Sequence, residues 1–70
     1  MNYKEFCNKY NVAYIDYDKT TIEAIEKIIN GNIDDMYDNP ILYRYVGLYY
    51  NEVKKDYIIA EKYFSYINQT

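Results

Sequence analysis

Residues 40–68 read PILYRYVGLYYNEVKKDYIIAEKYFSYIN, and most of the fold can be inferred from them. Asn39 and Pro40 mark a helix start, because Asn caps helix N-termini and Pro loses no hydrogen bond at the first helical position. Apolar residues with helical spacing follow and continue most of the way round the helix: Leu42, Tyr45, Val46 and Tyr49, then Tyr43, Leu48 and Tyr50. A helix that is apolar on nearly all sides is predicted to be central, with neighbours on two faces.

A second amphipathic helix follows Asp56, which is a good N-cap residue. Its apolar side chains fall in one half of the helical wheel, namely Tyr57, Ala60, Tyr63, Phe64 and Ile67. The link Asn51–Lys55 between the two helices is short and forces them to be antiparallel. We therefore expect residues 40–68 to form an αα-hairpin.

Gly47 lies inside the first helix of this hairpin. A glycine there costs roughly 1 kcal/mol relative to alanine. We expect it to permit the close approach of another backbone, and the alternative is a break in the helix.

Two further helices are predicted upstream. Thr20 and Glu23 match a capping box, a face of four isoleucines follows, and Gly31 is a natural stop, so residues 21–30 are expected to be helical. A helix is also expected from about Asn2, because its apolar residues have helical spacing: Tyr3, Phe6, Cys7 and Tyr10. The segment Val12–Ile15 either continues that helix or is extended.

The hairpin resembles a tetratricopeptide or Sel-like repeat. Its first helix has a large residue, a glycine and an aromatic at the matching positions, and its second has an acid, two aromatics and a small residue: Val46, Gly47 and Tyr50, then Asp56, Tyr57, Ala60 and Phe64. Residues 1–35 match only in the placement of their helices. The resemblance implies one all-α domain over residues 1–70, in which two antiparallel αα-hairpins, 1–35 and 36–70, stack as a short solenoid or small helical bundle. Degenerate repeats rich in Tyr and Asn also resemble those in proteins of giant DNA viruses.

The composition excludes several kinds of chemistry. The chain has no His and a single Cys, so imidazole chemistry, a zinc site and an internal disulfide are excluded, and we predict no enzyme activity and no cofactor. A net charge of −3 without a basic block argues against nucleic-acid binding. No apolar run approaches the roughly 18 residues of a membrane span, and no secretory signal is present, so we expect a cytoplasmic location. Cys7 is interpreted as a small buried hydrophobe, with a reactive thiol as the alternative.

The acids between the helices are interpreted as structural. Asp34, Asp35 and Asp38 precede a helix N-terminus, where negative charge offsets the helix dipole, and no partner for acid–base catalysis is near in sequence.

The twelve tyrosines are the candidate functional residues. Core positions are predicted for Tyr45, Tyr49, Tyr57 and Tyr63. By contrast, Tyr43, Tyr50 and Tyr66 fall at the edges of their apolar sectors, where tyrosine can anchor a partner protein. The alternative is that the tyrosines have no binding role and reflect core filling and an AT-rich genome, whose codons favour Tyr.

These observations predict a protein–protein interaction module or scaffold that binds a protein, a peptide or a second copy of itself. The alternative prediction is a small viral regulatory or inhibitor protein that binds a host protein, or one of a rival virus, through an acidic, Tyr-rich face.

Overall fold

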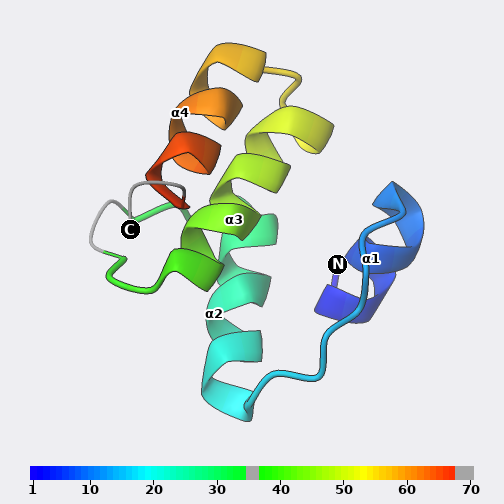
Figure 1. The fold of residues 1–70 in the computed structure, drawn as a ribbon. Helices are drawn as coiled ribbons and strands as arrows, with labels where there is room; N and C mark the ends of the chain where they lie inside the picture. Colours follow the sequence, from blue (N-terminus) through cyan, green and yellow to red (C-terminus); the bar gives the residue numbers. More distant parts are fainter. Residues whose placement is uncertain (35–36, 68–70) are drawn as a thin grey trace.

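The computed structural model describes residues 1–34 and 37–67, which form four α-helices and one π-helical turn (Figure 1). In chain order the elements are α1 (Tyr3–Tyr10), α2 (Lys19–Ile29), α3 (Pro40–Leu48), η1 (Tyr49–Val53) and α4 (Tyr57–Ile67). These described residues contain no β-strand, so the predicted all-α class is confirmed.

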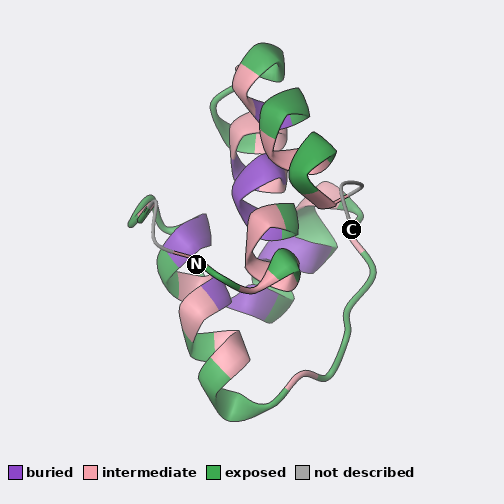
Figure 2. Cartoon of the chain, turned by 60° about the vertical axis from the view of Figure 1, so that its left-hand side comes forward, coloured by how far each residue is buried: buried purple, intermediate pink, exposed green. Residues whose placement is uncertain are grey.

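The central element is α3, which packs against both α2 and α4. Nine buried side chains from α1, α2, α3 and η1 form the core, and they are Tyr3, Phe6, Cys7, Ile25, Ile28, Ile29, Tyr45, Val46 and Tyr49. Figure 2 shows the buried positions where helices face one another, whereas the outer side of α4 is exposed. The predicted central position of the helix after Pro40 is confirmed.

All four helices begin at a capping side chain. Asn2 accepts a hydrogen bond from Glu5 N at 2.8 Å, and Asn39 accepts one from Ile41 N at 3.0 Å. Asp56 accepts one from Ile59 N at 3.2 Å, as its position before α4 predicted.

The predicted capping box at Thr20 is wrong. Helix α2 begins at Lys19, and the side chain of Asp18 accepts the hydrogen bond from Thr21 N at 2.7 Å. The extended backbone of Asp18, with ψ of 162°, aims its carboxylate at the first turn, which leaves Thr20 inside the helix.

Helix α2 ends as predicted. Gly31 has a φ of +93°, a conformation that favours glycine. Gly31 N donates to Ile28 O and Asn32 N donates to Lys27 O, both at 2.9 Å, which are the paired bonds of a Schellman motif.

Residues 12–18 are not helical, so the extended alternative holds for Val12–Ile15. Asn11, with a φ of 56°, ends α1, and the chain then runs back toward the first turn of that helix. Ile15 N donates to the hydroxyl of Tyr3 at 3.1 Å, and the ring of Tyr14 stacks on the ring of Tyr3 with centroids 5.1 Å apart.

Because residues 11–18 run back along α1, residues 1–35 do not form the close antiparallel hairpin that was predicted for them. The first turn of α1 lies against the last part of α2, where Tyr3 N donates to Glu26 Oε2 at 2.8 Å and Asn30 Nδ2 donates to Met1 O at 2.8 Å. The end of α1 and the start of α2 are far apart in Figure 1, because residues 11–18 span the distance between them. The fold is therefore a small all-α bundle that contains one close antiparallel hairpin, α3 with α4.

The link in that hairpin is shorter than predicted. Residues 51–53 continue the helix as the π-helical turn η1 instead of forming a loop. Lys54 N donates to Tyr49 O at 3.2 Å, which is the wide bond of a π-turn, and Lys55, with a φ of 57°, then reverses the chain.

Gly47 does allow a close approach, but its neighbour is a side chain and not the predicted backbone. A β-carbon at position 47 would lie 2.6 Å from Cε1 of Phe64, and α3 continues through the glycine unbroken. Ala60 is buried at the same interface between the two helices.

Tyr57 is not a core residue, contrary to prediction. It is 60% exposed, because it starts α4 directly after the link, at an end of the hairpin that no described element covers.

Candidate protein-interaction surface

The structure brings together the three tyrosines that were predicted to contact a partner. Tyr43, Tyr50 and Tyr66 gather around Tyr63 on one flank of the α3/α4 hairpin. The centroid of the Tyr63 ring lies 6.1 Å from that of Tyr43, 6.1 Å from that of Tyr50 and 5.9 Å from that of Tyr66. We call these four residues the tyrosine surface.

Helical spacing explains why these four rings meet. Tyr43 and Tyr50 are seven residues apart, about two turns along α3 and η1, and Tyr63 and Tyr66 are one turn apart on α4. Tyr50 lies parallel to Tyr63, with 7° between the ring planes, while Tyr66 meets Tyr63 edge to face at 89°. Both arrangements are favourable for aromatic pairs.

The members of the tyrosine surface differ in how far they belong to the core. Tyr50 and Tyr63 are half-buried and pack against the core cluster. Tyr43 is half-buried without being part of that packing, and Tyr66 is 39% exposed. Tyr43 and Tyr66 are therefore the members whose rings remain available to a partner.

Tyr63 was predicted as a core residue and was missed as a site residue. Tyr63 lies beside the main apolar stripe on the helical wheel and is half-buried, which places it at the border of the buried side of α4. That border position was the signal in the sequence that could have identified it.

A shallow pocket of about 410 Å³ opens on this flank, lined by Tyr43, Tyr63, Tyr66 and Lys62. No carboxylate of the described residues is among its lining side chains. The pocket offers aromatic faces, hydroxyl groups and one ammonium group, and this set suits apolar contact combined with hydrogen bonds to an acidic or carbonyl group.

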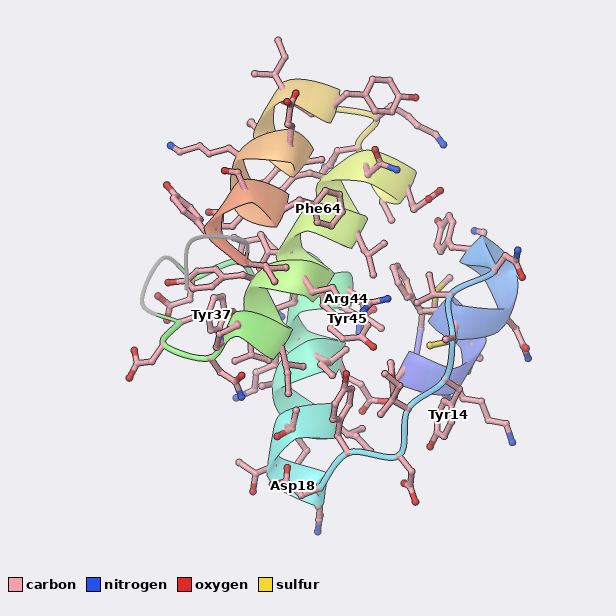
Figure 3. All side chains as sticks on the ribbon, in the orientation of Figure 1. Tyr14, Asp18, Tyr37, Arg44, Tyr45 and Phe64 are labelled. Atoms are coloured by element: carbon pink, nitrogen blue, oxygen red, sulfur yellow. The ribbon has the colours of Figure 1, made fainter. Side chains whose placement is uncertain are left out.

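The opposite flank of the same hairpin is different. A pocket of about 340 Å³ there is lined by Arg44, Leu48, Phe64 and Ile67. Figure 3 shows Phe64 reaching from α4 over α3, where its ring covers Gly47. The residues that line this pocket include one aromatic ring, whereas those that line the pocket on the tyrosine flank include three.

A wider groove of about 940 Å³ runs along α2. Its small and apolar lining residues are Ala24 and Ile33, and its charged ones are Glu23, Lys27 and Asp34. Tyr37, labelled in Figure 3, closes one side of the groove and donates from its hydroxyl to Asn32 O at 3.1 Å. We call this feature the α2 groove.

A second group of tyrosines is structural. Tyr3, Tyr17 and Tyr45 meet with ring centroids 5.5 to 6.4 Å apart, and the hydroxyls of Tyr3 and Tyr45 lie 2.8 Å from each other. Burial raises the pKa of both Tyr3 and Tyr45 above the ordinary value. Figure 3 shows Tyr45 on the side of α3 that faces α1, so this group joins α1 and residues 11–18 to the core.

Cys7 lies in the core and is 4% exposed, which confirms its interpretation as a small buried hydrophobe. Burial raises the pKa of its thiol, and a raised pKa disfavours the reactive thiolate.

The acidic run has two described members. Asp34 lines the α2 groove, and Asp38 is exposed directly before the Asn39 cap. Asp35 lies outside the described residues, as does Asn68 at the end of the predicted hairpin. The helix-dipole interpretation of the run stays a prediction.

Comparisons with protein-family models, with curated proteins and with solved structures found no match. Among the described residues no helix has both the length and the apolar character that crossing a bilayer requires. In the same part of the chain, no three His, Cys, Asp or Glu side chains are grouped as metal ligands.

Proposed function

We propose that this chain is a protein–protein interaction module and that the tyrosine surface is its binding face. The observation that carries the proposal is the gathering of four tyrosines, of which two are outside the core packing and three line a pocket with one cation. Tyrosine is enriched in protein interfaces, because it supplies a large apolar contact area and a hydroxyl group from a rigid side chain.

The packing of Tyr43 and Tyr66 also supports the tyrosine surface as the binding face. The core cluster is complete without Tyr43 and Tyr66, so their positions are not explained by core packing. Each ring instead packs on other rings of the surface, with the centroids of Tyr43 and Tyr66 5.7 Å apart. Rings held in this way lose little conformational entropy when a partner covers them, which favours binding.

Three finer predictions belong to the same proposal. The α3/α4 hairpin is assigned to the tetratricopeptide-like class, on its Gly47, Ala60 and Phe64 contacts. The module acts inside the cell, and it acts by binding instead of by catalysis. The alternative of a viral regulator with an acidic, Tyr-rich face is not favoured here, because the described lining of the tyrosine pocket carries Lys62 and no carboxylate.

The proposal is tested by selecting peptides from a random display library against the chain. The selected peptides are then titrated against wild type, a Tyr43→Ser/Tyr66→Ser variant and an Arg44→Ser/Ile67→Ser variant of the opposite flank. We expect the tyrosine variant to lose at least about tenfold in affinity, as removal of two interface anchors does, and the opposite-flank variant to bind normally.

Circular dichroism of both variants establishes that they are folded. If the selected peptides bind the folded tyrosine variant as tightly as they bind wild type, the tyrosine surface is not the binding face.

A further inference from the structure

The two halves of the chain carry opposite net charge. Residues 1–39 hold four Lys and eight Asp or Glu, a net charge of −4, while residues 40–70 hold four Lys or Arg and three Asp or Glu, a net charge of +1. Unlike charges on two surfaces favour their encounter and fix their orientation. The charge distribution therefore favours contact between unlike halves of two copies of the chain.

The α2 groove lies in the acidic half of the chain and, at about 940 Å³, is wide enough to receive side chains. Ala24 and Ile33 give part of the groove a small, apolar lining, and its charged lining residues are Glu23, Asp34 and Lys27, so the acids outnumber the cation by one. Glu23 also pairs with Lys19 across 4.0 Å, but both side chains are largely exposed, and such a pair contributes little. The carboxylate of Glu23 can thus exchange Lys19 for another cation at small cost.

The tyrosine surface lies in the basic half and has the complementary chemistry. Tyr43 and Tyr66 present apolar rings with hydroxyl donors, and Lys62 lines the pocket between them. An aromatic ring placed against Ala24 and Ile33 would bring its hydroxyl to the carboxylates, and Lys62 would complement them.

We propose that the tyrosine surface of one copy docks into the α2 groove of a second copy, with Lys62 facing Glu23. This inference rests on the proposed function and names the partner as the chain itself. The two surfaces come from different helices, so each copy offers both of them at once. The proposed contact consists of a few tyrosine rings and one charge pair, so we expect the association to be weak and to depend on concentration.

Sedimentation equilibrium tests the contact from about 10 µM to about 1 mM chain, the range in which weak interfaces form. We expect the mass of wild type to rise with concentration, and to rise less at about 0.5 M salt, which screens the charge pair. Lys62→Glu and Glu23→Lys are each expected to stay monomeric, because each places like charges in contact. An equimolar mixture of the two variants is expected to associate again, because the intact Lys62 of one variant can face the intact Glu23 of the other, and the two substituted positions form a pair of reversed order.

Lys4→Glu and Asp16→Lys are the matched controls, since they make the same charge changes at exposed positions outside both surfaces. They are expected to associate like wild type. A wild type that stays monomeric at about 1 mM overturns the inference, and so does a mixture that stays monomeric while wild type associates.

The two proposals fail separately. Selected peptides that require Tyr43 and Tyr66 uphold the proposed function even when no self-association occurs. If peptide binding does not require Tyr43 and Tyr66 and the chain also stays monomeric, the tyrosine surface is not a binding face.

Discussion

The ring of Phe64 occupies the space that a side chain at Gly47 would need. A β-carbon at position 47 would stand 2.6 Å from Cε1 and 2.8 Å from Cδ1 of Phe64. The ring and the bare backbone therefore set the closest approach of α3 and α4. The same approach places the tyrosines of the two helices in register.

Gly47→Ala is expected to destabilise the protein. Alanine gains about 1 kcal/mol of helix propensity, but overpacking a contact of this kind costs about 1–3 kcal/mol. We expect a net loss of about 1 kcal/mol in the free energy of unfolding, measured by urea denaturation.

The control is the double variant Gly47→Ala/Phe64→Leu, in which a smaller side chain leaves room for the methyl group. It is expected to be more stable than Phe64→Leu alone. If Gly47→Ala is instead about 1 kcal/mol more stable than wild type, the full gain in helix propensity is realised and the Phe64 contact does not constrain position 47.

Tyr3→Phe is expected to cost more stability than Tyr45→Phe. The Tyr3 hydroxyl accepts from Ile15 N at 3.1 Å and also bonds the hydroxyl of Tyr45 at 2.8 Å, so its removal breaks two hydrogen bonds. Removal of the Tyr45 hydroxyl breaks the second of these bonds and ends its hydrogen-bond interaction with Tyr17, but it leaves the backbone bond from Ile15 N to Tyr3 in place. We expect losses of about 2 and about 1 kcal/mol, measured by urea denaturation, and equal losses would contradict the shared-acceptor role of Tyr3.

Stability is expected to fall in alkaline solution because of the same pair. The pKa of Tyr3 and Tyr45 is raised above the ordinary 10.0 in the folded state, mainly by burial. The unfolded chain therefore loses these protons first as the pH rises. The contribution of the two protonated hydroxyls to the free energy of unfolding is thus complete below pH 10 and declines above it.

Urea denaturation at about pH 9 and about pH 11 measures this decline. Tyr45→Phe is expected to reduce the difference between the two values, and Tyr57→Phe at an exposed position is the control. An unchanged difference in Tyr45→Phe would show that other groups cause the alkaline loss.

The helices could be predicted because their signals are local. Asn39, Pro40, Gly31 and Asp56 act within one turn of their own positions, and the apolar spacing of each helix is visible without knowing its neighbours. The π-turn η1 could not be predicted, because it depends on the hydrogen bond from Lys54 N to Tyr49 O and not on any periodic pattern.

The site could be predicted only in part, for a related reason. The edge positions of Tyr43, Tyr50 and Tyr66 are visible on separate helical wheels, but their meeting around Tyr63 depends on the register of α3 against α4. The contact of Phe64 with Gly47 determines that register in three dimensions. The hydrogen bond from Tyr3 N to Glu26 could not be predicted either, because the two residues are 23 positions apart in the sequence.

The cap of α2 provides the last prediction, because sequence and structure assign it to different residues. The carboxylate of Asp18 accepts from Thr21 N at 2.7 Å, and the hydrogen bonds from the Thr21 side chain and, second, from Thr21 N lower the pKa of Asp18 below its ordinary value. Asp18→Ala is expected to lower the unfolding midpoint in urea, whereas Thr20→Ala, at the cap position predicted from sequence, is expected to change it little.

The pH dependence separates the charge of Asp18 from its hydrogen bond. A lowered pKa means that the stabilisation is present above the ordinary value of 3.8 and is lost as the pH falls through the folded-state value. Asp18→Asn keeps an acceptor but has no proton to bind, so its stability is expected to decline less in acid than that of wild type. If Thr20→Ala is instead the more damaging substitution, the hydroxyl of Thr20 is the true cap and α2 begins where the sequence pattern placed it.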